Sequence, residues 1–402
     1  MDSSKLRVGI IGTGGRGVDC FGKLLRRRGD VELVAFCDPN PARMRKAAAE
    51  LEISPSYHSS VEAMVAGGGL DAVVITSPDF CHEANAVAAL KGGLNALIDK
   101  PLATTVKGCR AIIAAAAKSG KSAIMGFNLR HVETLKKLKS LVGSGELGKV
   151  FLIENREFYD GGKTYMSRWN RKYECSGGLW IHKGSHDFDV FNWLLDFPKP
   201  YKVSASAAVN VLKPEGLPFA TDPGVPAGPT CDLCAYKGKC PDAYLLGADA
   251  KWGAEAEACD GYRKNLCMYL SDKDTHDNGI AMVEYEGGVR ASHLECFVTS
   301  ISDRLYTVVG DKGMAEVSLE RRTIMLRPRW SQETILHQLP EAVGGHGGAD
   351  PSLVASFIDL CKGVSGQAAA TLEQGLLSTA IGQAAELSVR GNRTIFMDEL
   401  LG

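Results

Sequence analysis

Three side chains suited to acid–base chemistry lie close together in the stretch from Gly177 to Asp189. His182, His186 and Asp189 occupy positions i, i+4 and i+7, which share one face if the stretch is helical. Because an imidazole titrates near neutral pH, His186 is a candidate general base that Asp189 would orient. The alternatives are a metal pair of His182 with His186, for which the sequence implies no third ligand, and histidines satisfied inside a packed core.

A second candidate site is the glycine-rich turn near the start of the chain. The apolar residues Leu6–Ile11 predict a short buried strand, and Gly12, Gly14 and Gly17 follow it with G-x-G-x-x-G spacing. The first glycine permits a tight turn, the second lets the backbone approach a pyrophosphate, and the third lets helix pack on strand. The pyrophosphate would lie at the N-terminus of a helix that begins near Gly15 and Arg16.

An acidic residue follows the glycine turn at the distance that a dinucleotide site requires. Asp38 ends the apolar run Val31–Cys37, about twenty residues beyond the glycines. A carboxylate at this position accepts hydrogen bonds from a ribose diol and repels a 2′-phosphate, so we expect NAD rather than NADP. The alternative is an aspartate that caps the helix after Pro39.

Lys100 follows another apolar strand, in the sequence Asp99-Lys100-Pro101. This position places the lysine at the cofactor edge of the predicted sheet, and Pro101 favours an extended backbone at Lys100. There the ammonium group can hydrogen-bond a substrate hydroxyl. A solvated surface lysine is the alternative.

The elements that must position these residues alternate between strand and helix up to about residue 127. Such alternation predicts an α/β fold with a parallel, doubly wound sheet, and ligands of such sheets lie beyond the C-terminal ends of the strands. The predicted strands are Leu6–Ile11, Val31–Cys37, Ala72–Thr76, Ala96–Ile98 and Ala123–Gly126. The predicted helices are Pro41–Leu51, His82–Lys91 and Thr105–Ser119.

From residue 150 the pattern changes to strands separated by glycine turns, which predicts an α+β domain with an open, mainly antiparallel sheet. The predicted strands are Val150–Glu157, Val203–Val211, Ile280–Tyr285, Val289–Cys296, Leu305–Val309, Ala315–Ser318 and Thr323–Leu326, and the predicted helices are Ile181–Leu195, Pro351–Cys361 and Leu372–Arg390. We therefore expect an NAD-binding Rossmann domain at residues 1–127. Residues 128–402 would form a substrate-binding and oligomerisation domain, with the helices of 350–390 packing back toward the first domain.

Composition excludes several classes of protein. The 402 residues are 45% hydrophobic and 23% charged, as in an ordinary globular protein, and the length suggests two domains. The formal net charge of −1 gives no indication of nucleic-acid or membrane-surface binding. With no apolar run as long as a membrane span and no secretory signal, the sequence predicts a cytoplasmic protein.

Five of the twelve cysteines lie between Cys231 and Cys267. In a reducing compartment such a cluster favours a metal over disulfides. Cys231 and Cys234 have CxxC spacing, and Cys240 with Cys267 would complete a tetrahedral structural zinc site in a cysteine-rich insertion of residues 213–275. The alternatives are an iron–sulfur cluster and cysteines that are reduced or disulfide-bonded.

Four ordered motifs resemble the glucose–fructose oxidoreductase and inositol dehydrogenase family (Gfo/Idh/MocA). They are Gly9-Ile10-Ile11-Gly12-Thr13-Gly14, Thr76-Ser77-Pro78 with His82, Asp99-Lys100-Pro101, and Gly177-Gly178 through His186 and Asp189. The resemblance implies a Rossmann domain followed by an open-sheet domain, and a homodimer or homotetramer. It also implies oxidation or reduction of a sugar, cyclitol or related polyol with NAD or NADP.

The resemblance also implies roles for individual residues. Lys100 matches the lysine of the family's E-K-P motif, with Asp99 where Glu is commoner, and His186 matches the catalytic histidine. His186 would take the proton of the reacting hydroxyl while hydride passes to the nicotinamide, and Lys100 would hold the oxygen. The remaining cofactor-side candidates are Thr76, Pro78, His82, Asp99 and Asn128.

The candidate substrate residues lie mainly before the predicted helix. Aromatic side chains beside arginines can stack on a sugar and hydrogen-bond its hydroxyls, although a structural loop with ordinary salt bridges is the alternative. Well-studied members of the family carry an aspartate at the position of His182, so this chain's substrate contacts are expected to differ. The candidates are Arg130, Tyr165, Arg168, Trp169, His182 and Asp189.

The function that we expect is an NAD(H)-dependent dehydrogenase or reductase acting on a sugar, glycoside or cyclitol. One alternative is an NAD-dependent glycosidase, which oxidises a sugar hydroxyl transiently, eliminates the aglycone and returns the hydride. Another is a non-catalytic nucleotide-binding regulator. Both enzymes would use Lys100 and His186, so the sequence does not separate them.

Overall fold

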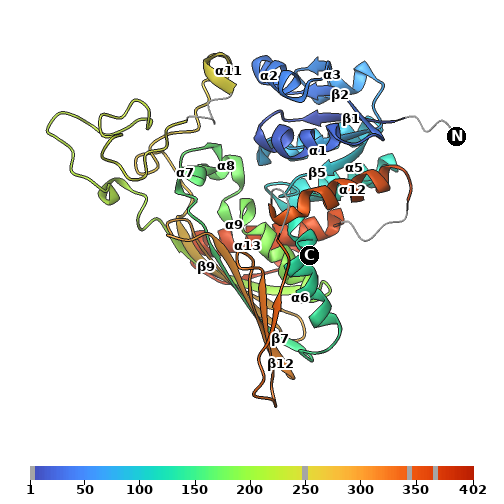
Figure 1. Cartoon of the computed structure of the whole chain (residues 1–402), viewed down its shortest axis with the longest axis vertical. Coiled ribbons are helices and arrows are strands. Elements are labelled where there is room, and N and C mark those ends of the chain that lie inside the picture. The colour runs from blue at the N-terminus through green and yellow to red at the C-terminus, as the bar shows by residue number, and fades with distance from the viewer. Residues whose placement is uncertain (1–4, 247–251, 342–345, 365–369) are drawn as a thin grey trace. The chain divides into compact units, whose positions relative to one another are not determined.

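The computed structural model of the chain describes residues 5–246, 252–341, 346–364 and 370–402. The chain divides into two compact units (Figure 1). Unit 1 comprises Met1–Val132, Ala250–Tyr262 and Ala342–Thr379, and unit 2 comprises Glu133–Asp249, Arg263–Glu341 and Ala380–Gly402. No helix in the described ranges has the length and apolar character needed to cross a membrane.

Unit 1 is built on a six-stranded parallel sheet with the order β3-β2-β1-β4-β5-β6. The order reverses between β1 and β4, and this reversal is the point at which ligands bind in doubly wound sheets. The predicted α/β fold is therefore confirmed. The strands are β1 (Leu6–Ile11), β2 (Val31–Cys37), β3 (Ser56–His58), β4 (Ala72–Ile75), β5 (Asn95–Ile98) and β6 (Ala123–Met125).

The helices of unit 1 connect these strands and carry clear start signals. The Asn40 side chain caps α2 by accepting from the backbone N–H groups of Ala42 and Arg43, and Thr105 caps α5 through Gly108. The helices are η1 (Arg16–Gly22), α1 (Lys23–Arg26), α2 (Pro41–Leu51), α3 (Val61–Gly67), η2 (Asp79–Cys81), α4 (His82–Lys91), α5 (Val106–Ser119), η3 (Asn128–His131), α11 (Gly253–Asp260), η7 (His346–Gly348), α12 (Ala349–Cys361) and the first turns of α13 (Leu372–Gly391).

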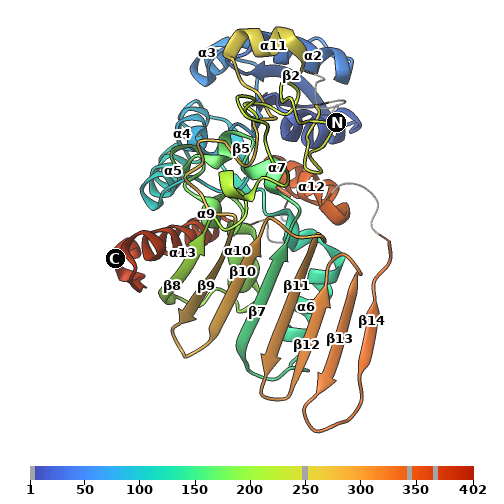
Figure 2. The same cartoon turned by 90° about the vertical axis from the view of Figure 1, so that its left-hand side faces the viewer.

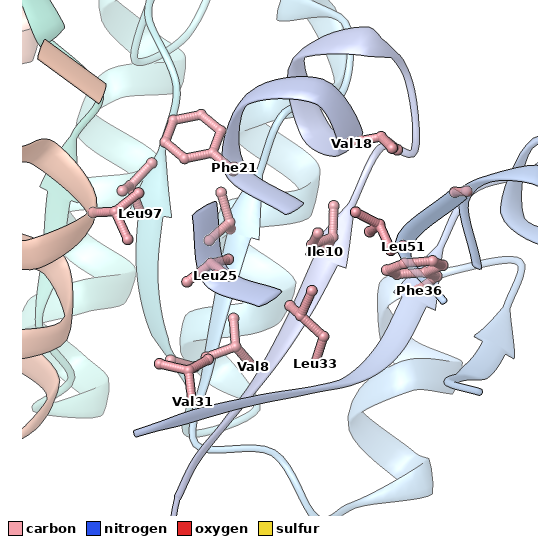
Figure 3. Close-up of a cluster of buried hydrophobic side chains, with 14 of the residues drawn as sticks. Val8, Ile10, Val18, Phe21, Leu25, Val31, Leu33, Phe36, Leu51 and Leu97 are labelled. Atoms are coloured by element: carbon pink, nitrogen blue, oxygen red, sulfur yellow. The ribbon is translucent and has the colours of Figure 1, made fainter. Parts of the chain in front are cut away.

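One face of this sheet holds a core drawn from distant parts of the chain. Val8 and Phe36 of the sheet belong to one buried cluster with Phe21 of η1 and Leu51 of α2 (Figure 3). Phe357 of α12 belongs to the same cluster. Burial of each such side chain stabilises the fold by about 1.5–3 kcal/mol. The core therefore attaches α12, near the end of the chain, to the nucleotide-type sheet.

Unit 2 is built on a nine-stranded sheet with the order β14-β13-β12-β11-β7-β10-β9-β8-β15 (Figure 2). Its pairings are antiparallel except that of β7 with β10, so the predicted open and mainly antiparallel sheet is confirmed. The strands are β7 (Val150–Phe158), β8 (Pro200–Ala208), β9 (Asn278–Tyr285), β10 (Arg290–Cys296), β11 (Asp303–Gly310), β12 (Gly313–Ser318), β13 (Thr323–Pro328), β14 (Ile335–Gln338) and β15 (Ile395–Phe396).

Helices cover one face of the unit 2 sheet. Along β9, the buried residues Ala281 and Val283 alternate with the exposed residues Ile280 and Met282, as expected for a strand with one covered face. The helices of unit 2 are α6 (Glu133–Gly143), α7 (Gly162–Tyr165), η4 (Trp169–Arg171), α8 (Tyr173–Ser176), α9 (Leu179–His182), α10 (Ser185–Leu194), η5 (Pro214–Gly216), the last turns of α13, and α14 (Asp398–Leu401).

Two predicted elements of unit 2 are present but differ in extent from the prediction. The strand expected at Val203–Val211 ends at Ala208, because the Asp277 carboxylate accepts the backbone N–H groups of residues 210–212 at 2.8–3.0 Å. The single helix expected at Ile181–Leu195 is two helices, α9 and α10, separated at Lys183 and Gly184. The short elements β3, α3, β14 and β15 were not predicted, since they lack long apolar runs.

Candidate active site

The glycine turn of unit 1 is closed against β4 and open at its middle glycine. A Cβ on Gly12, whose φ is +91°, would lie 2.5 Å from the Ser77 backbone nitrogen, and one on Gly17 would lie 2.2 Å from the Gly12 oxygen. The Thr76 hydroxyl donates to that same oxygen at 2.8 Å. At Gly14, in contrast, a Cβ would meet none of the described atoms within 4 Å. The turn therefore leaves its backbone accessible where a pyrophosphate would approach, and it fits a dinucleotide.

The Asp38 carboxylate is buried at the end of β2 and ties that strand to the glycine turn. Oδ2 accepts from the Thr13 backbone N–H at 2.9 Å and from its hydroxyl at 3.0 Å, and Oδ1 accepts from the Asn40 N–H at 2.9 Å. A carboxylate has about four acceptor positions, so it retains capacity for a ribose hydroxyl. The helix cap that was the alternative role for Asp38 is supplied by Asn40.

The Lys100 loop follows β5 and is held by a histidine. The peptide bond between Lys100 and Pro101 is cis. His82 is buried, with Nδ1 2.7 Å from the Pro101 carbonyl oxygen and Nε2 2.9 Å from that of Ser77. His82 thus spans the loops after β4 and β5, and it positions the backbone of both.

Arg16 and Asp99, both predicted on the cofactor side, bind each other. Arg16 Nε donates to Asp99 Oδ2 at 2.9 Å, and its Nη1 lies 3.2 Å from both oxygens of Asp350. Asp350 also accepts from Asn128 Nδ2 at 3.2 Å. The buried Asn128 Oδ1 has no hydrogen-bond partner among the described atoms and can accept from a bound group. Sequence reasoning missed Asp350, which lies in the first turn of α12, just before the predicted helix Pro351–Cys361.

The remaining predicted residues of unit 1 lie near these loops. Pro78 precedes η2. Arg130 is buried, donates to Gln374 Oε1 at 2.7 Å and stacks over Phe127 at 5.6 Å. In the described structure Arg130 therefore fastens η3 to the start of α13.

In unit 2, His182 and His186 lie on different helices. His182 is the last residue of α9, whereas His186 is in the first turn of α10 and Asp189 lies one turn further, fully buried. The break falls at Gly184, where a Cβ would lie 2.7 Å from the Trp180 carbonyl oxygen. The expected continuous face is therefore interrupted between the two histidines.

Aromatic side chains surround His182. Tyr165 and Trp169 meet its ring edge-on, with centroids at 5.6 and 5.3 Å, and Asn170 Nδ2 lies 3.2 Å from Nε2. The structure thus brings together three of the predicted substrate residues. Arg168 donates from Nη2 to the Tyr244 hydroxyl at 3.1 Å, in the cysteine-rich segment.

A buried network of charges fixes the junction between α9 and α10. Lys183 Nζ lies 2.9 Å from Glu157 Oε1, and Arg304 pairs with both Glu157 and Asp187. The Tyr306 hydroxyl donates to Asp187 at 2.5 Å. Two cations and two carboxylates leave the network neutral. Lys183 and Asp187 flank His186 in the sequence. Glu157 lies on β7, and Arg304 and Tyr306 lie on β11. For these strand residues, only the alternation of side chains along a strand indicates which of them face inward.

The network shifts the pKa values of its members. Burial alone would lower the pKa of Lys183, but the charge and hydrogen bond of Glu157 together with Tyr165 outweigh it, and the pKa is raised. For Arg304, too, burial is opposed by Glu157 and Asp187, and the pKa is raised. Burial, followed by the Asp187 charge, raises the pKa of Tyr306. Both cations therefore stay charged, and Asp187 holds the first turn of α10 to the sheet.

The cysteines of the cysteine-rich segment are unpaired with one another in the structure. Cys231, Cys234 and Cys267 are buried, Cys240 is half-buried, and none of the twelve cysteines, all within the described ranges, forms a disulfide. Burial, followed by the neighbouring thiols of Cys267, Cys240 and Cys234, raises the pKa of Cys231 to about 12. Across the described residues, no group of three or more His, Cys, Asp or Glu side chains is arranged to hold a metal ion.

Comparison with known proteins identifies relatives along the whole chain. YteT of Bacillus subtilis (strain 168), named as an oxidoreductase, is 28% identical over an alignment that covers 92% of each chain. Inositol 2-dehydrogenase/D-chiro-inositol 3-dehydrogenase of Halalkalibacterium halodurans is 29% identical over 55% of this chain and 60% of its own. In fold, the chain is similar to levoglucosan dehydrogenase in complex with NADH and levoglucosan, with a TM-score of 0.74, 15% identity and coverage of 98% and 100%.

Family models match both units. Residues 6–127 match the oxidoreductase family with the NAD-binding Rossmann fold, and residues 139–397 match the C-terminal alpha/beta domain of the same family. These matches cover the glycine turn, the Lys100 loop and the His186 helix in one order along the chain. The chain is therefore an NAD-binding oxidoreductase of the Gfo/Idh/MocA family.

Proposed function

We propose that this oxidoreductase transfers hydride between NAD and a hydroxyl-bearing carbon of a sugar, glycoside or cyclitol. Lys100 and His186 would form the catalytic pair. The observation that carries the proposal is that buried polar contacts fix the backbone segment that bears Lys100 and the one that bears His186. His82 holds the Lys100 loop, and Asp187 holds the first turn of the helix that bears His186.

Each residue has one task in this proposal. When bound, NAD accepts or donates the hydride. The imidazole of His186 takes the proton of the reacting hydroxyl during oxidation and returns it during reduction. The ammonium group of Lys100 binds that same oxygen and stabilises the negative charge that develops as the proton leaves.

The substrate class is supported by the named relatives and by the side chains around His182. The relatives act on inositols and levoglucosan by name, and both are polyhydroxylated rings. Tyr165 and Trp169 offer apolar ring surface next to the polar atoms of His182 and Asn170. A sugar or cyclitol presents the same combination of C–H faces and hydroxyl edges.

The test is a panel of sugars, cyclitols and aryl glycosides, incubated with NAD while NADH and free aglycone are both followed. We expect substrate-dependent NADH. Lys100→Ala and His186→Ala should each lower kcat/KM by roughly 10²–10⁴-fold, with the exposed Lys118→Ala as matched control. Full activity in either variant would overturn the catalytic pair. Aglycone release without net NADH would instead establish the glycosidase, and NADH binding without any turnover would establish the regulator.

The structural zinc ion that the sequence predicts on Cys231, Cys234, Cys240 and Cys267 stays a prediction, because the described side chains are not arranged to hold a metal ion. The prediction rests on the CxxC spacing of Cys231 and Cys234. The two loops that carry the four cysteines are joined by hydrogen bonds from Cys231 N to Asn265 O at 2.9 Å and from Cys267 N to Pro229 O at 2.8 Å. Metal analysis of the purified protein should find about one zinc per chain. A protein without zinc or iron above trace would refute it.

The cytoplasmic location and the homodimer or homotetramer stay predictions. Size-exclusion chromatography with light scattering measures the oligomeric state directly.

A further inference from the structure

Helix α11, within the cysteine-rich stretch, packs on helix α2 next to the Asp38 loop. Asn40 Nδ2 donates to the Ala256 carbonyl oxygen and to Asp260 Oδ2, both at 2.8 Å. Lys46 Nζ donates to the Trp252 carbonyl oxygen at 2.7 Å. Trp252 and Ala256 are buried in the same core as Phe36. All these residues belong to unit 1, so α11 is a built-in part of the nucleotide-type domain.

This packing immobilises a particular arginine. Arg43, in the first turn of α2, has Nη2 2.6 Å from Asp260 Oδ2, and its guanidinium lies 5.6 Å from the centre of the Tyr262 ring. The Tyr262 backbone N–H in turn donates to Asp260 Oδ1 at 3.0 Å. The pair is partly exposed, with 18% of the Arg43 side chain and 31% of the Asp260 side chain accessible. Arg43 is therefore held by α11 but remains within reach of a solute.

The position of Arg43 matters because side chains near the end of the second strand of a dinucleotide-binding fold determine whether NAD or NADP binds more tightly. An acid there selects the free 2′-hydroxyl of NAD, whereas a nearby arginine accommodates the 2′-phosphate of NADP. Arg43 comes five residues after Asp38, and Asn40 bonds both to Asp38 through its backbone and to Asp260 through its side chain. Arg43 is the cationic residue nearest to Asp38 in the sequence. Without Asp260, its guanidinium could bind a 2′-phosphate.

We propose that Asp260 is a cofactor-selectivity residue: by binding Arg43 and adding a second carboxylate beside the Asp38 loop, α11 excludes NADP and enforces NAD. This inference rests on the proposed nucleotide site at Asp38. It gives the cysteine-rich stretch a role in cofactor choice, in addition to any ordering that a metal supplies.

The experiment measures the dissociation constants of NADH and NADPH by fluorescence titration, which needs no substrate. The wild type should bind NADH more tightly. In Asp260→Asn and Asp260→Ala, the ratio of the NADPH to the NADH dissociation constant should fall roughly tenfold, because Arg43 becomes available to the 2′-phosphate. Adding Arg43→Ala to Asp260→Ala should restore much of the lost selectivity.

The matched control is Glu255→Ala, which removes the ion pair between Glu255 of the same helix and Arg45 of α2. It should leave the ratio unchanged. A ratio that stays within about twofold of wild type in both Asp260 variants would overturn the selectivity role. An equal loss of affinity for NADH and NADPH would overturn it too. A wild type that binds neither cofactor would overturn the proposed function instead, so the two failures are distinguishable.

Discussion

Nδ1 of His82 lies 2.7 Å from the carbonyl oxygen of Pro101, the residue that follows Lys100. Its other ring nitrogen lies 2.9 Å from the Ser77 carbonyl oxygen, so one buried imidazole connects the loops after β4 and β5. His82, which the sequence predicts to contact the cofactor, therefore contacts backbone carbonyl groups through both of its ring nitrogens. His82 is a positioning residue for the Lys100 loop.

His82→Ala should lower kcat more than it raises the KM for NAD. It removes both contacts and leaves the buried Pro101 carbonyl group without its partner, at a cost of about 1–3 kcal/mol in the free energy of unfolding. Steady-state kinetics and thermal unfolding measure the two effects. His58→Ala, which removes a histidine that contacts Ser56 near the end of β3, is the control. Equal loss of kcat in both variants would contradict a specific role for His82.

Breaking the ion pair between Lys183 and Glu157, whose charged atoms are 2.9 Å apart and almost fully buried, should destabilise the fold strongly. Lys183→Met leaves one carboxylate deficient in partners, so we expect the free energy of unfolding to fall by about 3–5 kcal/mol. The double variant Lys183→Met with Glu157→Gln should recover part of that loss. Urea unfolding of the wild type, the single variants Lys183→Met and Glu157→Gln, and the double variant gives the coupling energy, and strictly additive losses would show that the pair does not act as a unit.

Stability should also depend on pH through Glu386. Burial raises the pKa of Glu386 from its ordinary value of 4.5 to about 7, partly opposed by His276 and the Trp180 N–H. Because the folded protein favours the protonated carboxyl, this contribution to stability is complete below pH 4.5 and is lost as pH rises through about 7. The rise of the pKa from 4.5 to about 7 corresponds to a contribution of at most ~3 kcal/mol to the free energy of unfolding.

Glu386→Gln removes the titrating group and keeps its size. Its free energy of unfolding relative to wild type should therefore increase between about pH 5 and pH 8.5, where wild-type Glu386 must ionise inside the protein. Glu373→Gln, at an exposed position of the same helix, should show no such change. A difference that does not depend on pH would show that the buried carboxyl does not titrate in this range.

How much of the structure could be predicted depends on how local the determining contacts are. The glycine turn, Asp38 and the helices α2 and α4 follow from short patterns, since turns, caps and apolar periodicity act over a few residues. Asp350 could not be found in this way, because its partner Arg16 is 334 positions away. The break between α9 and α10 also escaped, because helical periodicity continues across it while Lys183 turns inward to Glu157.

The candidate site was predictable in part for the same physical reason. Lys100 and His186 belong to motifs, so the sequence indicates them, but it does not indicate the residues that hold them. Asp187 looks like an ordinary acidic residue in a helix until Tyr306 and Arg304 of β11 are placed beside it. Long-range pairing between strand and helix creates that environment, and no local pattern encodes it.

Two glycines of the turn should separate folding from cofactor binding. A Cβ on Gly17 would lie 2.2 Å from the Gly12 oxygen and 2.6 Å from the Thr76 hydroxyl, whereas one on Gly14 would meet no described atom within 4 Å. Gly17→Ala should therefore lower both the melting temperature and NADH affinity. Gly14→Ala should leave the melting temperature unchanged and still weaken NADH binding roughly tenfold or more, since only the ligand would meet the added methyl group. Thermal unfolding and NADH titration of the two variants test this, and unimpaired NADH binding by Gly14→Ala would show that the pyrophosphate does not approach the turn at Gly14.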